Sequence, residues 1–128
     1  MKNKGLVSFL LMSVFALSGR AQNIDLGAVY EIQTAGGLVL DNLGSLDNDA
    51  SIFLAKRDVG KASQVWKFVK VDENVYNIVN AHSMLSVDNG NGNTMRTVLQ
   101  WTTDNGNPNQ QWSAKRLANG YYTFTCKA

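Results

Sequence analysis

Few side chains in this sequence are of types that carry out catalysis or bind a metal. His82 is the only His and Cys126 the only Cys among the 128 residues, so neither a zinc site nor a Cys-His nucleophile has support. His82 follows Asn80-Ala81 in a predicted turn, which indicates a surface position. The ten Asp and Glu residues would suffice for glycoside hydrolysis, yet none forms a recognisable pair. We therefore predict no enzymatic activity and no cofactor.

A run of Asp, Asn and Gly, DNGNGN from Asp88 to Asn93, resembles the start of a calcium-binding loop. Such loops carry an acidic ligand at the twelfth position. That position is Leu99 in this chain, so the sequence predicts no bound metal.

The first residues have the pattern of a secretory signal peptide. Lys2 and Lys4 precede an apolar run from Leu6 to Leu17, and small residues lead to Ala21. The run is too short to span a bilayer comfortably, and no Cys near the expected cut supports a lipid anchor. We therefore assign residues 1–21 to a signal peptide, leave them outside the fold, and expect a secreted or periplasmic protein with no membrane span after cleavage.

Residues 22–128 are predicted to form one small domain of nearly neutral charge. Without the leader, nine Lys and Arg oppose ten Asp and Glu, a formal net charge of −1. No basic stripe could neutralise several phosphates, so nucleic acid is not an expected partner. Cys126 has no second Cys within the chain to pair with; a buried apolar role is favoured, and a link between chains stays open.

The sequence repeats itself at a spacing of 46 residues. Tyr30 and Tyr76 open the two copies, Trp66 and Trp112 close them, and Tyr122 lies another 46 residues on. The matching segments are AVYEI with NVYNI, LVLDN with LSVDN, and SQVW with NQQW. A third Gln-x-Trp would fall beyond the last residue. The predicted units are repeat one at about residues 28–72, repeat two at about 73–117, and the start of repeat three at 118–128.

Each copy is predicted to consist of short strands joined by turns. VYEI, LVLD, SIFL and VWKFV are β-branched or aromatic runs separated by Gly, Asn and Asp clusters. Pro108 lies in a predicted turn, and the Asn-Gly pairs supply residues that tolerate the positive φ of tight hairpins. No long segment of helical periodicity occurs outside the leader, so we predict an all-β domain.

The combination of a Tyr-opened strand, L-x-V-D-N and a closing N-Q-x-W resembles the ricin B-type lectin family over residues 28–128. The resemblance implies a β-trefoil of three repeats, here incomplete, with two full repeats and the first strand of a third. It also implies that Gln-x-Trp is structural. Trp66 and Trp112 would fill the core, while Gln64 and Gln110 would bond to neighbouring backbone groups, as buried amides must.

The resemblance assigns sugar binding to Asp88, Trp101 and Asn109 of repeat two. An aromatic ring covers the apolar face of a sugar, a carboxylate accepts from two adjacent hydroxyls, and an amide both donates and accepts. Trp101 lies in the polar stretch QWTTDNG and Trp112 already supplies the core, so we expect Trp101 to be exposed. Gln100 is a further candidate contact, although neighbours along a strand point to opposite faces.

Repeat one departs from this pattern. Asp41 is kept, but Ala55 stands at the position of Trp101 and Ser63 at the position of Asn109. Without a stacking ring this site should be weak or inactive, and Asp41 is most simply a turn residue that accepts from nearby backbone amides. Repeat three ends before its corresponding positions, so no site is assigned there.

The resemblance implies an exported lectin-type domain that binds a glycan or polysaccharide non-covalently. Galactose-type sugars, xylan and other glycans all remain open. Fold alone does not determine function, so two alternatives stay: a non-lectin trefoil that acts as a protein-interaction or inhibitor scaffold, and a binding-module fragment of a secreted glycosidase. Exposure of Trp101 favours the lectin.

A trefoil closes only when its third repeat supplies the remaining strands, and 120–125 provides one strand at most. We therefore predict that residues 22–128 expose a sheet edge and self-associate, unless a longer chain continues the fold. Size exclusion coupled to light scattering measures this directly. A sharp monomer peak with a cooperative melt would contradict the prediction.

Overall fold

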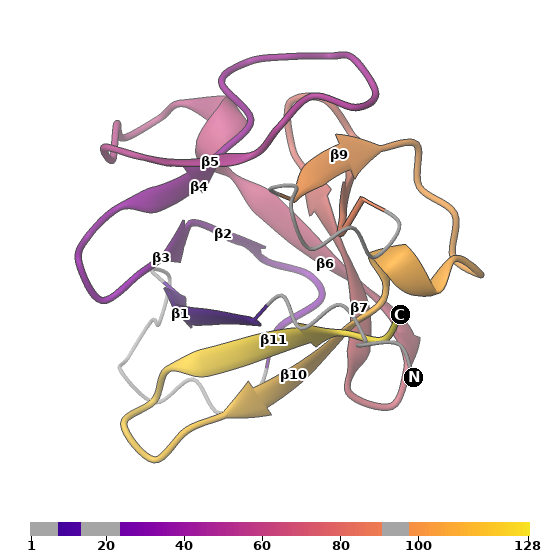
Figure 1. The fold of residues 1–128 in the computed structure, drawn as a ribbon. Coiled ribbons are helices and arrows are strands. Elements are labelled where there is room, and N and C mark those ends of the chain that lie inside the picture. The colour runs from indigo at the N-terminus through magenta and orange to yellow at the C-terminus, as the bar shows by residue number, and fades with distance from the viewer. Residues whose placement is uncertain (1–7, 14–23, 91–97) are drawn as a thin grey trace.

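The computed structural model of the protein describes residues 8–13, 24–90 and 98–128. It consists of short antiparallel strands (Figure 1), which confirms the predicted all-β class. Within these ranges no helix is long and apolar enough to cross a membrane. The elements are β1 (Ser8–Ser13), β2 (Val29–Tyr30), β3 (Ile32–Gln33), β4 (Val39–Asp41), β5 (Phe53–Ala55), η2 (Ala62–Gln64), β6 (Trp66–Asp72), β7 (Val75–Asn80), β8 (Ser86–Asp88), β9 (Leu99–Trp101), η3 (Pro108–Gln110), β10 (Trp112–Arg116) and β11 (Tyr122–Cys126), where η marks a short 3-10 helix.

The Tyr that opens each repeat lies opposite the Trp that closes it. In repeat one Tyr30 of β2 pairs with Trp66 of β6, and in repeat two Tyr76 of β7 pairs with Trp112 of β10. β6 pairs with β7, and β10 pairs with β11, so each repeat joins the next through a hairpin. β11 begins at Tyr122, which gives repeat three its opening strand. The register of the sheet thus repeats with the sequence.

The two Trp residues of the Gln-x-Trp segments lie in the interior with no exposed surface. The indole N–H of Trp66 donates to the carbonyl of Leu40 over 3.0 Å, and that of Trp112 donates to the carbonyl of Val87 over 3.0 Å. The indole of Trp66 thereby links the start of β6 to β4. The indole of Trp112 links the start of β10 to β8 in the same way. Burying an indole without a partner for its N–H would cost free energy.

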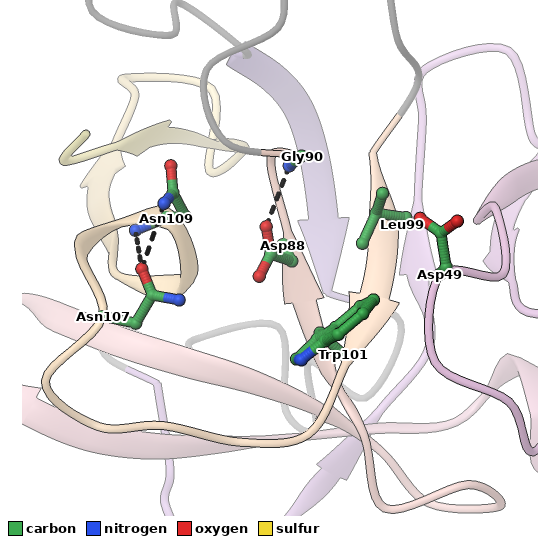
Figure 2. Close-up of a pocket in the computed structure, with 7 residues that line it drawn as sticks. All are labelled: Asp49, Asp88, Gly90, Leu99, Trp101, Asn107 and Asn109. Atoms are coloured by element: carbon green, nitrogen blue, oxygen red, sulfur yellow. Dashed lines mark hydrogen bonds between the residues drawn. The ribbon is translucent and has the colours of Figure 1, made fainter.

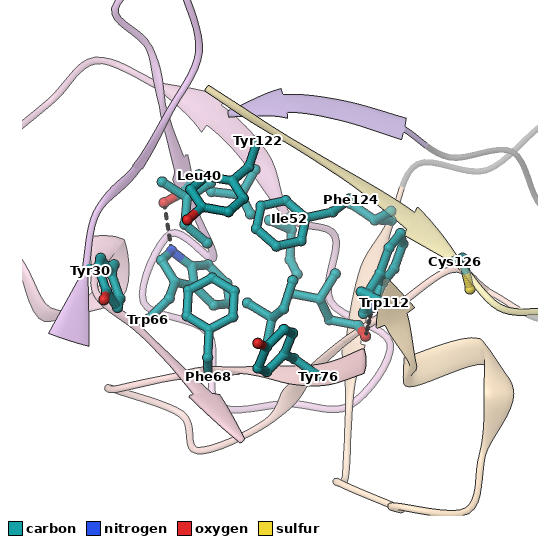
Figure 3. Close-up of a cluster of buried hydrophobic side chains, with 14 residues drawn as sticks. Tyr30, Leu40, Ile52, Trp66, Phe68, Tyr76, Trp112, Tyr122, Phe124 and Cys126 are labelled. Atoms are coloured by element: carbon teal, nitrogen blue, oxygen red, sulfur yellow. Dashed lines mark hydrogen bonds between the residues drawn. The ribbon is translucent and has the colours of Figure 1, made fainter. Parts of the chain in front are cut away.

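An aromatic cluster completes this core (Figure 3). The ring of Phe68 contacts Tyr30 and Tyr76 edge-on and stacks on Phe124, with centroids 5.5, 5.9 and 5.6 Å away. Strands of all three repeats therefore share one interior. Cys126 lies buried at its border, and burial raises the pKa of its thiol.

Strand β1 lies in the sheet although the sequence analysis left its residues outside the fold. It pairs with β11 from Ser8 opposite Thr125 to Leu11 opposite Tyr122, and with β3 through Met12 and Ser13. The edge of β11 that faces away from β10 is thus covered by the chain's own amino-terminal segment. This pairing belongs to the whole chain, and the assignment of residues 1–21 to a cleaved signal peptide stays a prediction.

The buried indole of Trp112 should dominate the stability of repeat two. We predict that Trp112→Ala lowers the free energy of unfolding by roughly 3–5 kcal/mol, as deletion of core aromatics does, because it also leaves the Val87 carbonyl without its partner. Urea denaturation measures the change. Trp101→Ala is the matched control, since that Trp is 44% exposed. Equal midpoints for the two variants would contradict this account of the core.

Candidate functional site

The residues that the resemblance assigned to sugar binding line one hollow of about 360 Å³ (Figure 2). β8 contributes Asp88, β9 contributes Trp101, and η3 contributes Asn109. The full lining is Asp49, Asp88, Gly90, Leu99, Trp101, Asn107 and Asn109. Two strands and a short helix that are separated in sequence therefore bring these three side chains together.

The floor of the hollow is apolar and comes from alternate residues of β9. Leu99 is buried, whereas Trp101 is 44% exposed, which agrees with the exposure expected from its polar surroundings. Residues two apart on a strand share a face, so both side chains lie on the side of the hollow. The exposed indole face offers a flat surface of the kind that stacks on a sugar ring.

The carboxylate of Asp88 is buried and held in a fixed orientation. Its Oδ1 accepts from the backbone N–H of Gly90 over 2.8 Å, and its Oδ2 accepts from Nε2 of Gln110 over 3.1 Å. Because a carboxylate has about four lone-pair sites, these two bonds leave it able to accept further hydrogen bonds. The side chain is therefore both positioned and chemically suited to receive hydroxyl groups.

Asn109 is positioned by its neighbour Asn107, which caps η3. Oδ1 of Asn107 accepts from the backbone N–H of Asn109 over 2.9 Å and from Nδ2 over 3.1 Å. The carbonyl of Asn109 accepts from the N–H of Asn89, just after β8, over 3.0 Å. These bonds hold the turn that carries Asn109 against the strand that carries Asp88.

The Gln of each Gln-x-Trp segment links the buried core to the Asp carboxylate of its own repeat. Gln110 donates from Nε2 to Asp88 and to the carbonyl of Thr102, and accepts at Oε1 from the N–H of Asp104. Gln64 makes the same three bonds in repeat one, with Asp41, Lys56 and Asp58. Both amides have no more than 1% of their surface exposed. They are bonded to backbone groups, as the resemblance implied, and also to the carboxylate of their own repeat.

Gln100 does not line the hollow, and the predicted sugar contact is corrected. Its side chain is completely buried. Nε2 donates to the carbonyls of Ser45 and Asp47, while Oε1 accepts from Asn42 and Ser83. Strand alternation turns it away from Trp101, so it instead ties a loop of repeat one to the underside of β9.

Repeat one has the same buried scaffold, but the carboxylate that corresponds to Asp88 is enclosed by its neighbours. Asp41 has no exposed surface, and it accepts from the N–H of Leu43 over 2.6 Å and from Gln64 over 3.0 Å. Lys61, which occupies the position of Asn107, lies 3.4 Å from Asp41. Ala55 supplies no ring. Repeat one therefore has no ring at the position of Trp101, and a cation lies beside its carboxylate.

Other candidate chemistry gains no support in the described part of the chain. No three His, Cys, Asp or Glu side chains there gather as metal ligands. His82 is exposed, as expected. The DNGNGN run extends into residues 91–97, which lie outside the described residues.

Asp49, Leu99 and Asn107 line the hollow but were not predicted as site residues. Leu99 could have been inferred from alternation with Trp101, and Asn107 from the capping pattern N-P-N-Q before Gln-x-Trp. Asp49 belongs to repeat one, and no spacing within repeat two points to it. Only the three-dimensional arrangement brings it to this hollow.

The repeated strands, the buried Gln-x-Trp pairs and the half-exposed Trp beside an oriented carboxylate define a β-trefoil of the Gln-x-Trp class. A family model described as ricin-type beta-trefoil lectin domain-like matches residues 20–97 and 62–128. The chain belongs to this family. No curated protein matches it.

Solved structures of the same fold are similar to this chain. The designed 3-fold symmetric protein ThreeFoil is 29% identical with a TM-score of 0.66, over 71% of this chain and 66% of its own. An exo-beta-1,3-galactanase from Clostridium thermocellum is 30% identical with a TM-score of 0.68, over 84% of this chain and 24% of its own. The cytolethal distending toxin from Actinobacillus actinomycetemcomitans is 12% identical with a TM-score of 0.61, over 80% of this chain and 81% of its own, and shows the fold alone. The chain thus spans just under two thirds of ThreeFoil and about a quarter of the galactanase.

The buried carboxylate of Asp41 in repeat one should make the folding stability depend on pH. Burial disfavours the charge on Asp41, but hydrogen bonds from Gln64 and the N–H of Leu43, together with the charge of Lys61, outweigh it and lower the pKa of Asp41 below 3.8. A lowered pKa in the folded state stabilises the protein above the unfolded pKa, and this stability is lost as pH falls through the folded value.

We therefore predict that Asp41→Asn lowers the melting temperature near neutral pH, and that the gap from wild type narrows as pH falls below 3.8. Thermal melts between about pH 7 and pH 2 measure the gap. Asp47→Asn, at an exposed carboxylate, is the control. A gap that stays constant with pH would show that the Asp41 charge contributes nothing.

Proposed function

We propose that this domain binds carbohydrate non-covalently in the hollow of repeat two. The observation that carries the proposal is the half-exposed indole of Trp101 beside the oriented carboxylate of Asp88. A sugar ring would stack its apolar face on Trp101, while its hydroxyls donate to Asp88 and exchange hydrogen bonds with Asn109. Membership of a lectin-like family supports the assignment.

The similar solved structures suggest which sugar to try first. One of them is an exo-beta-1,3-galactanase, an enzyme named for a galactose polymer. This chain matches about a quarter of that protein, so the choice of sugar is itself part of the proposal. A β-1,3-linked galactose oligosaccharide is the first probe, within a glycan array that includes xylan fragments.

Binding without catalysis is the second part of the proposal. Glycoside hydrolysis needs one carboxylic acid that holds a proton for the leaving group. Both oxygens of Asp88 already accept hydrogen bonds within the scaffold, which suits this side chain to accept hydrogen bonds from sugar hydroxyls as well. We therefore assign Asp88 to hydrogen bonding with the sugar and not to proton transfer.

Removal of the stacking ring should weaken binding while leaving the fold intact. We predict that Trp101→Ala weakens affinity for the best array ligand by roughly 1–3 kcal/mol, about five- to 150-fold, through lost stacking and exclusion of water. Isothermal titration calorimetry measures the affinity. Thermal melts of the same samples should match wild type.

The chain offers a matched control for this experiment. Phe53 on β5 is 46% exposed, close to the 44% of Trp101, and does not line the hollow. Phe53→Ala should therefore bind normally. Unchanged affinity in Trp101→Ala would remove this residue from the site. An array on which the wild-type domain binds no glycan would favour the protein-interaction scaffold instead.

A further inference from the structure

A second pocket, of about 270 Å³, shares no described lining residue with the hollow of repeat two. The described residues that line it are Ile24, Asn74, Tyr76, Ala114, Lys115, Arg116 and Tyr122. Two of these side chains are cationic and none is acidic. All ten Asp and Glu residues of the chain lie within the described ranges, so no acidic side chain outside those ranges can balance the two cations. We refer to this second pocket as the basic pocket.

Arg116 reaches the basic pocket from the face of β10 that turns toward the core. It lies directly opposite Tyr122 of β11 in the strand register, and residues paired in this way project from the same face of a sheet. Tyr122 is 9% exposed and belongs to the core cluster. Arg116 therefore continues the row of Trp112 and Ala114 on β10 and ends it with a solvent-exposed cation.

Repeat one has a corresponding cation, but a carboxylate lies beside it. Lys70 precedes Arg116 by 46 residues and lies opposite Tyr76, as Arg116 lies opposite its own Tyr. The ammonium of Lys70 is 3.7 Å from the carboxylate of Glu73. The residue 46 positions after Glu73 is the uncharged Asn119. Among the described residues, which include every Asp and Glu, none forms an ion pair with Arg116.

Three carboxylates lie close to lining residues in the sequence, namely Asp25, Asp72 and Glu73. Oδ1 of Asp25 accepts from the N–H of Gly27 over 2.8 Å, and Oδ1 of Asp72 accepts from the N–H of Glu73 over 2.8 Å. None of the three carboxylates lines the basic pocket. The charged side chains that do line it are thus of positive sign.

The other polar side chains of the basic pocket can donate hydrogen bonds. Burial raises the pKa of the Tyr122 hydroxyl, against the opposing charge of Arg116, so this hydroxyl keeps its proton near neutral pH. The carbonyl of Asn74 accepts from the N–H of Ala114 over 3.0 Å, which ties the turn that carries Asn74 to β10. An amide and a phenol donate single hydrogen bonds, whereas a guanidinium binds sulfate or phosphate through two parallel N–H bonds.

We propose that the basic pocket is a second binding site, which takes a small oxyanion of the sulfate or phosphate type on the guanidinium of Arg116. Lys115 adds positive charge, and the side chains of Asn74 and Tyr76 supply further donors. The same chemistry recognises a free anion and a sulfate or phosphate ester on a glycan. This inference does not depend on the proposed function, because it concerns different residues.

The full chain is titrated with sodium sulfate and sodium phosphate, at a constant ionic strength set with sodium chloride, while NMR follows the backbone amides. At about pH 7 Arg and Lys are charged, and wild type should show saturable shifts around Arg116 and Tyr122. Arg116→Gln should weaken binding about tenfold or more, because it removes charge-assisted hydrogen bonds. Shifts in wild type that do not saturate would overturn the inference.

Two further variants separate this site from general attraction of anions to the surface. Lys70→Gln removes the corresponding cation of repeat one and should keep the wild-type affinity. Asn119→Asp adds a carboxylate near Arg116 while keeping the oxygen that accepts from the N–H of Tyr121 over 3.0 Å. It should weaken binding about two- to fivefold, the range of an exposed ion pair. Equal affinities in Lys70→Gln and Arg116→Gln would overturn the inference.

Sugar esters identify the source of the anion. Galactose 6-sulfate and galactose 6-phosphate are titrated beside uncharged galactose. Tighter binding of the esters than of the inorganic anions assigns the basic pocket to a charged glycan, and equal binding assigns it to the free anion. Shifts of the same amides with uncharged galactose would overturn the inference. Trp101→Ala should leave anion binding unchanged, so failure of the proposed function and failure of this inference are distinguishable.

Discussion

The structure depends on a buried amide that must have every polar atom bonded. Gln110 is enclosed by the fold, and leaving its donors or acceptor without partners would cost free energy comparable to several hydrogen bonds. Its partners come from β8, from the segment after β9, and from the turn before η3. The constraint that stabilises the interior therefore also sets where Asp88 and Trp101 lie relative to each other.

Comparison of the two repeats shows that the buried Gln and Trp are bonded in the same way although the residues near the Asp carboxylates differ. Gln64 and Trp66 make the same hydrogen bonds as Gln110 and Trp112, so both copies are held in the same way. The differences lie at the surface, where Ala55 replaces the ring and Lys61 lies beside the carboxylate. These differences leave the hydrogen bonds of the buried Gln and Trp unchanged, so the fold of a repeat does not depend on which residues stand at these positions.

The elements that the sequence predicted are those whose residues repeat. The 46-residue spacing of Tyr and Trp reflects a pairing in which each Tyr lies opposite its Trp, so periodicity alone located the core strands. Exposure of Trp101 followed from its polar neighbours. Gln100 was misassigned because three of its four side-chain partners, Asn42, Ser45 and Asp47, belong to repeat one. The sheet position of β1 could not be inferred either, since its apolar run also fits a leader.

Repeat one also shapes the hollow of repeat two. Gln100 binds the carbonyls of Ser45 and Asp47 and thereby fixes the loop of repeat one that precedes Asp49. That loop then pairs with β9 through Asp49 and Ala50, so β9 is held from both sides. Repeat one thus supplies one wall of the hollow in repeat two.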